Sequence, residues 1–284
     1  MTGTVEITQE LGAFLRARRE RLDPSEFGLP QRRQNRRTPG LRREEVADLA
    51  GVSIDYVVRL EQGRGLRPSP EVLDALAQAL RLAPDERMYL FDLARQRPPD
   101  DGKPATVASP DLAHLVAALA PLPAMVINHR YDILAWNPQM SRLLLDFDTL
   151  PPRQRNSMWL CLLYPGMCDF YADRERTVRE GIAGLRSAWA AHPDDRVLAD
   201  LIDEFRTGSA EFAELWERRD VRVQGRGNKT MRHPRVGELT VSFEALVPMQ
   251  DPDQRLIIYR AADESSQAAL DRLQGSPANP QEAE

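Results

Sequence analysis

The spacing of apolar residues predicts a first domain made of short helices. Residues 9–22 place leucine and phenylalanine side chains at helical spacing, with arginines on the opposite face. Residues 42–97 continue with the same period and are interrupted by Gly51 and by a segment rich in glycine and proline at 63–70. Four or five short helices in fewer than one hundred residues predict a compact all-α domain over residues 1–97.

Two segments of this domain have a more specific interpretation. Residues 23–41 contain three prolines and two glycines and predict a long basic loop. Ser69 and Pro70 predict the start of a helix, because a hydroxyl group caps the first turn and proline is favoured within it.

The pattern changes in a polar segment with four prolines at residues 97–110. This segment has no periodicity, and we interpret residues 98–110 as a linker between two domains. Residues 111–265 are then long enough to form a second domain with its own core. Residues 266–284 are expected to form a C-terminal tail that is partly disordered.

The second domain combines strands and helices. Apolar runs at 124–128 and 133–136 flank the sequence HRYD and predict a β-hairpin. Residues 139–219 are largely helical, and residues 221–261 return to strand alternation in three segments. In the clearest segment, apolar residues occupy every second position from 239 to 247, which predicts a half-buried strand. The chain is therefore expected to be multidomain, all-α and then α+β.

The segment RREEVADLAGVSIDYVVRLEQG, from Arg42 to Gly63, fits a helix-turn-helix. Ala47 is small enough for two helices to cross closely, and Gly51 supplies the positive φ of a tight turn. Ser53 is placed to cap the second helix by accepting a hydrogen bond from the N–H of residue 55 or 56. An ordinary helical hairpin would need similar residues, but the agreement over some twenty positions and the neighbouring arginines favour DNA binding.

The exposed face of the second helix is expected to enter the major groove of double-stranded DNA. The residues expected on this face and at its edges are Ser53, Ile54, Asp55, Tyr56, Val58, Arg59 and Gln62. Arg59 can make a bidentate contact to guanine. Asp55 can accept a hydrogen bond from cytosine or, alternatively, orient Arg59 one turn later.

The charge distribution supports this assignment although the net charge does not. The chain has 38 basic and 43 acidic residues and a net charge of −5, which by itself argues against a nucleic-acid partner. Residues 1–97 carry +2 and residues 98–284 carry −7, and residues 16–43 contain ten arginines against three acidic residues. Arg42 and Arg43, at the start of the first motif helix, are expected to contact phosphates, as are Arg36 and Arg37 on the loop. Any one loop arginine can equally be a solvated charge.

The segment LRREEVADLAGVSIDYVVRLEQGRGLRPSPEVLDALAQALRL resembles the helix-turn-helix domain of the xenobiotic-response-element family, which is Cro-like and lambda repressor-like. More narrowly, RRQNRRTPGLRREEVA and WERRDVRVQGRGNKTMRHPRVGELTVSFEALVPMQDPDQRLIIY resemble the MmyB-like transcriptional regulators, a bacterial and mostly actinobacterial family. This resemblance covers residues 8–265. It implies a PAS-like ligand-binding domain associated with fatty-acid-type ligands, and a basic residue at Arg64 that contacts the DNA backbone.

The ligand site is expected among the aromatic, thioether and polar residues of the second domain. The expected ligand-binding residues are Trp136, Asn137, Met140, Met158, Trp159, Tyr164, Trp189, Trp216, Arg222 and His233. Flat rings and methionines can line an apolar cavity, and an inward guanidinium or imidazolium would hold a carboxylate. The same residues can simply fill a core, and His233 with Pro234 can shape the end of a hairpin.

Enzymatic function has little support. Cys161 and Cys168 form neither a zinc motif nor a disulfide framework, and no nucleophile or phosphate-binding motif is present. No apolar stretch is long enough to span a membrane, and no signal peptide precedes the first helix, so a cytoplasmic protein is expected. We expect a ligand-responsive transcriptional regulator, a homodimer without metal or cofactor. The alternatives are a regulator whose second domain only dimerises and a DNA-tethered enzyme.

Overall fold

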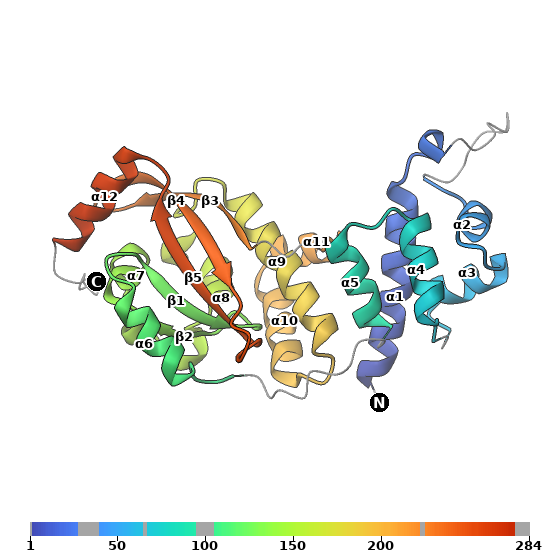
Figure 1. Ribbon diagram of the computed structural model, residues 1–284, viewed down its shortest axis with the longest axis horizontal. Helices are drawn as coiled ribbons and strands as arrows, with labels where there is room; N and C mark the ends of the chain where they lie inside the picture. Colours follow the sequence, from blue (N-terminus) through green and yellow to red (C-terminus); the bar gives the residue numbers. More distant parts are fainter. Residues whose placement is uncertain (1, 28–39, 65–66, 95–104, 222–224, 276–284) are drawn as a thin grey trace. The chain divides into compact units, whose positions relative to one another are not determined.

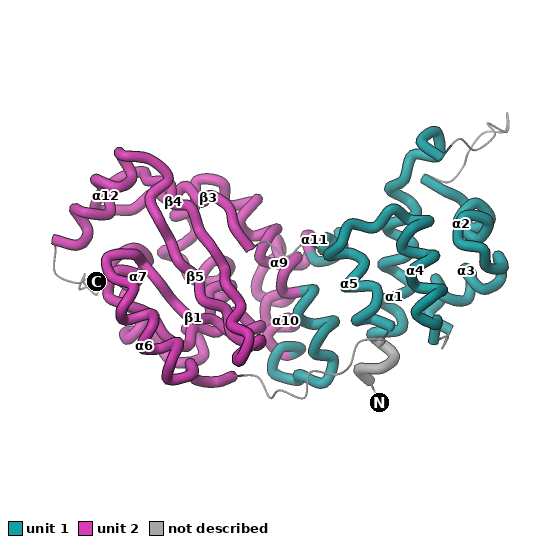
Figure 2. The backbone as a smooth tube through the Cα atoms, viewed as in Figure 1, with its two compact units in different colours: residues 1–100, 186–199, 216–222 teal, residues 101–185, 200–215, 223–284 magenta. Residues whose placement is uncertain are grey.

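The computed structural model describes residues 2–27, 40–64, 67–94, 105–221 and 225–275, and it divides into two compact units (Figures 1 and 2). The first unit is all-helical. Its helices are α1 (Thr2–Arg21), η1 (Pro24–Phe27), α2 (Arg43–Ala50), α3 (Ile54–Glu61), α4 (Pro70–Ala79) and α5 (Pro84–Leu93). This confirms the expected all-α region, including the start of α4, where the hydroxyl of Ser69 accepts a hydrogen bond from the N–H of Val72.

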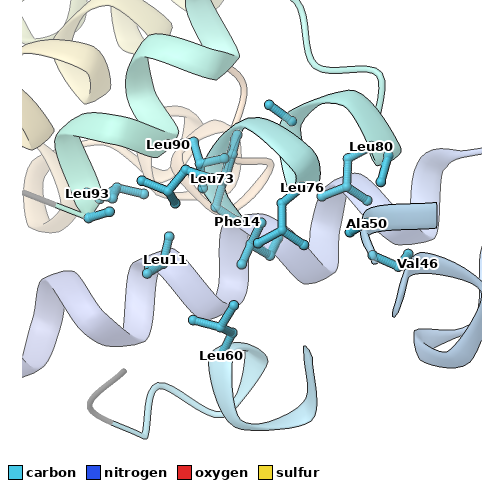
Figure 3. Close-up of a cluster of buried hydrophobic side chains, with 14 of the residues drawn as sticks. Leu11, Phe14, Val46, Ala50, Leu60, Leu73, Leu76, Leu80, Leu90 and Leu93 are labelled. Carbon is cyan, nitrogen blue, oxygen red and sulfur yellow. The ribbon is translucent and has the colours of Figure 1, made fainter. Parts of the chain in front are cut away.

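The core of the first unit forms where α1 meets the helices that follow it. Figure 3 shows Leu11 and Phe14 of α1 close to Leu60 of α3 and to Leu76 and Leu90 of the following helices. All five side chains are buried. Because the apolar residues of α1 recur at helical spacing, one face of this long helix is covered by its neighbours.

Segments far along the chain complete this first unit. Residues 186–199 and 216–221 group with it, although the sequence placed them in the second domain (Figure 2). Ala190 and Val221 are buried in the same apolar cluster as the helices of the first unit. Contact of these apolar side chains with that cluster explains the difference, and spacing along the sequence cannot reveal it.

A buried polar network also ties these segments to the first unit. The carboxylate of Glu10 accepts a hydrogen bond from the hydroxyl of Tyr89 at 3.1 Å and from Nη1 of Arg186 at 2.5 Å. Arg186 also donates to the main-chain carbonyl of Trp216 and stacks its guanidinium over that indole ring at 4.0 Å. Nε of Arg219 lies 3.3 Å from the second oxygen of Glu10. The charge of Arg186, which is 1% exposed, is therefore compensated.

The second unit is built on one antiparallel sheet. Its strands are β1 (Ala124–Asn128), β2 (Ile133–Trp136), β3 (Arg226–His233), β4 (Gly237–Leu246) and β5 (Gln254–Ala261), in the order β2-β1-β5-β4-β3. The hairpin and the three later strands agree with the sequence prediction. Together with the helices around the sheet, they confirm an α+β fold of the expected PAS-like class.

The remaining helices and short helical turns follow the first unit along the chain, and several of them contact the sheet (Figure 1). They are α6 (Pro110–Ala118), α7 (Pro138–Leu143), η2 (Phe147–Thr149), η3 (Pro152–Gln154), α8 (Ser157–Leu163), η4 (Pro165–Met167), α9 (Arg174–Ala191), α10 (Arg196–Gly208), α11 (Ala210–Glu217) and α12 (Glu264–Gln274). Leu112 and Val116 of α6 pack on Ala124 and Val126 of β1 and on Leu256 of β5. This places α6 on the face formed by the even-numbered residues of these two strands.

Helix α12 corrects the expected boundary at residue 265. The tail expected over residues 266–284 begins as a helix whose Ala269, Leu270 and Leu273 are buried. The side chain of Asp263 caps α12 by accepting from the N–H of Ser266 at 2.8 Å. Small and charged residues between these apolar positions made the segment resemble a tail, but its apolar residues recur at helical spacing.

Candidate DNA-binding helix and ligand cavity

Helices α2 and α3 form the expected helix-turn-helix. Ala47 is buried, and the N–H of Val52 donates to its carbonyl at 3.0 Å. Gly51, between the helices, has φ 66°, a backbone conformation that favours glycine. The sequence predicted both features, and the structure confirms them.

Ser53 caps α3 as expected, because its hydroxyl oxygen accepts from the N–H of Tyr56 at 3.1 Å. The buried side of α3 carries Val57 and Leu60. Ile54 is 49% exposed, and the other residues expected to face DNA lie on the same outer side. Asp55, Arg59 and Gln62 are exposed, and Tyr56 and Val58 are half-buried. This arrangement leaves an outer face that contains the one arginine of α3, Arg59.

A buried carboxylate at the end of α3 organises the arginines around it. The side chain of Glu61 is 2% exposed and accepts from Nε of Arg19 at 2.6 Å and from Nε of Arg43 at 2.7 Å. A third guanidinium, that of Arg16, lies 3.8 Å away. Arg19 also donates to the carbonyl of Leu41, at the start of the motif. Glu61 thus links α1, α3 and the N-terminal end of α2, and it fixes the direction of Arg43.

The other arginines expected to contact phosphates differ in how they are held. Nη1 of Arg42 lies 3.3 Å from Glu44, and its main-chain N–H donates to Glu45 at 2.7 Å. Arg64 is exposed and lines a shallow hollow together with Arg16. Arg36 and Arg37 lie outside the described residues.

The second unit contains a cavity of about 230 Å³ on the other face of its sheet from α6. Ligand sites in proteins are usually lined by apolar side chains with a few polar groups, as this cavity is. Four strands contribute eight of the lining residues: Met125, Ile127, Lys229, Phe243, Ala245, Arg255, Ile257 and Tyr259. These residues are all odd-numbered, and the strand pairing of Met125 with Ile257 and of Phe243 with Tyr259 places them on one face.

Helices α8 and α9 supply a further part of the cavity wall. Met158 of α8 and Thr177, Glu180 and Gly181 of α9 line it. A Cβ atom at Gly181 would collide with the sulfur of Met158, so a larger residue at this position would have to displace that flexible side chain. One turn later, a Cβ atom at Gly184 would collide with the hydroxyl of Tyr131.

Tyr131 belongs to both the cavity wall and the turn between β1 and β2. It has φ 70°, a conformation that is strained for a bulky residue. Its ring lines the cavity, and Arg255 lies over that ring with its guanidinium carbon 6.0 Å from the centroid. The strained backbone therefore aims an aromatic ring at the cavity and its hydroxyl at α9.

The charged groups of the cavity are few. Lys229, Arg255 and Glu180 line it among the described residues. The Lys229 ammonium lies 5.1 Å from the ring centroid of Phe243 and 5.5 Å from that of Tyr171. Burial raises the pKa of the Tyr171 hydroxyl well above its usual value. Burial also raises the pKa of the Cys161 thiol, another lining group, and so keeps this sulfur in its weakly nucleophilic protonated form.

Of the residues expected to bind the ligand, Met158 is among the described residues that line the cavity. Asn137 instead holds main-chain groups, accepting from the N–H of Ala124 at 3.1 Å and donating to the carbonyl of Leu122 at 2.8 Å. Met140 is fully buried in the core.

The aromatic residues of the second unit that were expected to bind the ligand have other neighbours. Trp136 packs on Phe147 at 5.2 Å between ring centroids. Trp159 donates from Nε1 to Glu204 at 3.2 Å and lies 6.4 Å from the ring of Tyr164. None of the three expected aromatics is among the described residues lining the cavity.

Four further expected residues lie elsewhere or are not described. Trp189 and Trp216 group with the first unit. His233 is at the end of β3, where Nε2 contacts the carbonyl of Arg142 at 3.1 Å and Nδ1 accepts from the N–H of Arg235 at 3.2 Å. Burial lowers the pKa of His233, which favours its neutral form. Arg222 lies outside the described residues.

The sequence analysis did not identify the strand residues that line the cavity, because apolar and polar residues do not alternate clearly along β3. The inward positions of β3 are Gly227, Lys229, Met231 and His233, of which one is a typical core residue. The register with β4, which pairs Lys229 with Val241, reveals the inward direction of the lysine. Sequence offers only the weak signal that Lys229 is one of two lysines among 38 basic residues.

Comparison with known families agrees with both sites. Residues 108–273 match the family described as the MmyB-like transcription regulator ligand binding domain. The chain belongs to the MmyB-like transcription regulators. In this MmyB-like regulator, residues 10–90 also match a helix-turn-helix domain family. No curated protein matches the chain significantly.

The two matches establish the general function of this MmyB-like regulator. It combines a DNA-binding domain and a ligand-binding domain, as expected for a ligand-responsive transcription regulator, and both families are binding domains rather than enzymes. The ligand-binding match extends to residue 273 and so includes most of α12. No described helix combines the length and apolar character needed to cross a bilayer.

Proposed function

We propose that the cavity of the second unit binds an apolar or amphipathic small molecule, such as a fatty acid, and that its occupancy changes the affinity of the regulator for DNA. The observation that carries this proposal is the cavity itself. Its volume of about 230 Å³ exceeds that of an engineered cavity of about 150 Å³ that binds benzene. Its wall consists largely of methionine, aliphatic and aromatic side chains, which suit the hydrocarbon chain of a ligand.

Helix α9 is the element through which occupancy would act. Thr177, Glu180 and Gly181, in its first half, line the cavity, whereas Arg186, in its second half, belongs to the first unit. Gly181 and Gly184 hold α9 in close contact with Met158 and Tyr131, so a ligand that displaces either side chain would also press on α9. The size of the response is limited by the difference in ligand affinity between the two DNA-binding states.

On DNA, we place α3 in the major groove, with Arg59 at a guanine and Asp55 beside it. Arg42, Arg43 and Arg64 would contact phosphates, since helix N-termini and guanidinium groups both attract anions. Helix-turn-helix proteins commonly bind as dimers to two half-sites, and we propose a homodimer on a palindromic or repeated operator.

The proposal is tested by native mass spectrometry of the full chain, purified without detergent and then mixed with dodecanoate. We expect an adduct that corresponds either to a copurified lipid-sized molecule or to one dodecanoate per chain. The control is Gly181→Leu, whose side chain would occupy space beside Met158 in the cavity and should prevent the adduct. Circular dichroism must show that this variant is folded.

The absence of any adduct with the wild-type chain, together with a dimer of unchanged mass, would contradict the proposal. That result would favour a second unit that only dimerises. An adduct that forms equally in the wild-type chain and in folded Gly181→Leu would place the ligand outside the cavity.

A further inference from the structure

The segment that leads into α6 is held by polar side chains from the ends of two strands. Asn128, the last residue of β1, donates from Nδ2 to the carbonyl of Ala105 at 2.9 Å. Asp253, directly before β5, accepts from the N–H of Ala105 at 2.5 Å. Its second oxygen contacts Nδ1 of His129. Both main-chain polar groups of Ala105 are therefore bound by side chains at one end of the sheet.

A second attachment follows four residues later, at Ser109. Its N–H donates to Oε1 of Gln254 at 3.1 Å, and its hydroxyl donates to Asp251 at 3.0 Å. Asn128 and Gln254 are 1% and 5% exposed. A buried amide that loses its hydrogen-bond partner costs free energy, so these contacts resist release of the segment.

The strands that hold this segment also line the ligand cavity. Asn128 of β1 pairs with Gln254 of β5, and the next pair along the two strands is Ile127 with Arg255. Ile127 and Arg255 line the cavity. Because successive residues of a strand point to opposite faces, the same strand ends carry the cavity on one face and the segment before α6 on the other.

The turn after β1 connects the two faces through one side chain. Oδ1 of Asn128 accepts from the N–H of Arg130 at 2.9 Å and from that of Asp132 at 3.0 Å, and its carbonyl accepts from the N–H of Tyr131 at 3.0 Å. The ring of Tyr131 lines the cavity. The oxygen of the Asn128 amide thus orders the turn that carries Tyr131, while the nitrogen of the same amide holds Ala105.

We propose that Asn128 and Asp253 are positioning residues that transmit occupancy of the cavity to the chain that leads to the DNA-binding domain. This inference rests on the proposed function, because it names a route by which that cavity acts. Residues 95–104, which lie outside the described residues, join the first unit to Ala105 along the sequence. An occupant that packs on Tyr131 orders the turn and tightens the hold on Ala105.

The chain also passes between the units within α9, so the experiment must separate two routes. Ala105→Pro removes the N–H that Asp253 accepts and leaves the side chains of the sheet unchanged. The affinity for an operator selected from random duplexes is measured with and without saturating dodecanoate. We expect the wild-type coupling, about 5- to 150-fold, to fall below about threefold in Ala105→Pro. Calorimetry without DNA should show a dodecanoate affinity within about threefold of the wild-type value.

The matched control for this variant lies in the same segment. Val107, between the two attachments, is 73% exposed, and Val107→Ser should retain the full coupling. Thermal melting must show that both variants are folded. A merely structural role of the segment would lower the melting temperature without changing the ratio of the two operator affinities.

Hydrogen exchange of the Ala105 amide gives a second readout that needs no DNA. Dodecanoate should slow this exchange in the wild-type chain by about fivefold or more. Without ligand, Tyr131→Ala should accelerate it, because the turn loses the ring that packs in the cavity wall. Phe243→Ala removes another ring of the cavity wall, on β4 and away from the turn, and should leave the Ala105 exchange unchanged.

The outcomes distinguish this inference from the proposed function. Full coupling in Ala105→Pro would assign the response to α9 and overturn the inference, while the ligand-responsive function stands. Equal losses of coupling in Ala105→Pro and Val107→Ser would also overturn it, since any change in the segment would then suffice. If the wild-type chain binds no dodecanoate, the proposed function fails. The exchange of Ala105 in Tyr131→Ala then decides the inference by itself, and an unchanged rate overturns it.

Discussion

A buried charge in one unit of this regulator and a half-buried charge in the other have opposite surroundings. In the DNA-binding unit, the carboxylate of Glu61 is 2% exposed and has guanidinium groups of three arginines around it, two of them within 2.7 Å. In the ligand-binding unit, Lys229 faces two aromatic rings and no described carboxylate within ion-pair distance. A compensated charge holds helices in place, whereas an uncompensated charge beside a cavity is available to a ligand.

This difference predicts the largest loss of stability at Glu61. Replacing Glu61 by glutamine leaves buried Arg19 with the half-buried Glu20, at 3.4 Å, as its one remaining described carboxylate partner, and the free energy of unfolding should fall by about 3–5 kcal/mol. Chemical denaturation of the full chain measures the loss. Glu44→Gln is the matched control, because Glu44 is exposed and makes one ion pair with Arg42, and its effect should stay below about 1 kcal/mol. Equal effects would show that the Glu61 cluster is not a stabilising network.

A substitution at Arg186 tests whether the C-terminal end of α9 stabilises the first unit. Arg186→Met removes the ion pair with Glu10 but leaves the carboxylate in contact with Tyr89 and Arg219. We expect a loss of about 2–3 kcal/mol, seen as faster amide hydrogen exchange in α1 and α5. Arg179→Met, at an exposed position on the same helix, is the control. Unchanged exchange in α1 would contradict the grouping of Arg186 with this unit.

Two arginines of the helix-turn-helix should affect DNA binding in different ways. Arg59→Ala should weaken binding to a selected operator by about 1–3 kcal/mol and weaken non-specific binding less, because it removes a base contact. Arg43→Ala should weaken both kinds of binding and lower the salt slope by about 1. Titrations of operator and unrelated duplexes at several salt concentrations measure these effects. Equal losses for Arg59→Ala would show that Arg59 contacts phosphate instead.

The same comparison predicts a small stability effect at Lys229. Because Lys229 makes no ion pair among the described residues, Lys229→Met should change the free energy of unfolding by no more than about 1 kcal/mol, and can increase it. Chemical denaturation without ligand measures this change. A loss of stability as large as that of Glu61→Gln would mean that the ammonium of Lys229 stabilises the fold. The contrast drawn between Glu61 and Lys229 would then be wrong.

His233 gives the smallest expected effect, a dependence on pH. Its Nδ1 accepts a hydrogen bond, and burial lowers its pKa below the usual 6.5. The folded state therefore favours the neutral ring, so stability is complete above pH 6.5 and falls as the pH drops from there through the lower pKa of the folded state. Chemical denaturation at pH 5.5 and 7.5 measures the free energy of unfolding. The difference between the two pH values should be smaller in His233→Gln than in the wild-type chain. His114→Gln, at an exposed position, should leave the difference unchanged.

Sequence predicted the features that depend on neighbours along the chain. The turn at Gly51, the cap at Ser53 and the alternation from Leu239 to Phe243 each follow from a local rule. The cap and the turn are confirmed in the geometry that the sequence indicated.

Features that depend on contacts between distant segments were missed. Arg186 meets Glu10 across 176 positions, and no pattern along the chain links them. The inward direction of Lys229 follows from the pairing of β3 with β4 rather than from β3 itself. The tryptophans expected at the ligand site instead pack on neighbouring rings, whereas smaller residues line the cavity, since a large ring fills space rather than leaving it empty.

The central claim is that occupancy of the cavity changes the affinity of the regulator for DNA. The most direct test first selects an operator from random duplexes. It then measures the affinity for this operator with and without saturating dodecanoate. We predict a change of about 5- to 150-fold in the wild-type chain, the range typical of allosteric coupling, and an equal change in dodecanoate affinity when operator is present. Folded Gly181→Leu should show no change. The same operator affinity with and without bound dodecanoate, when calorimetry shows that the ligand is bound, would contradict the account.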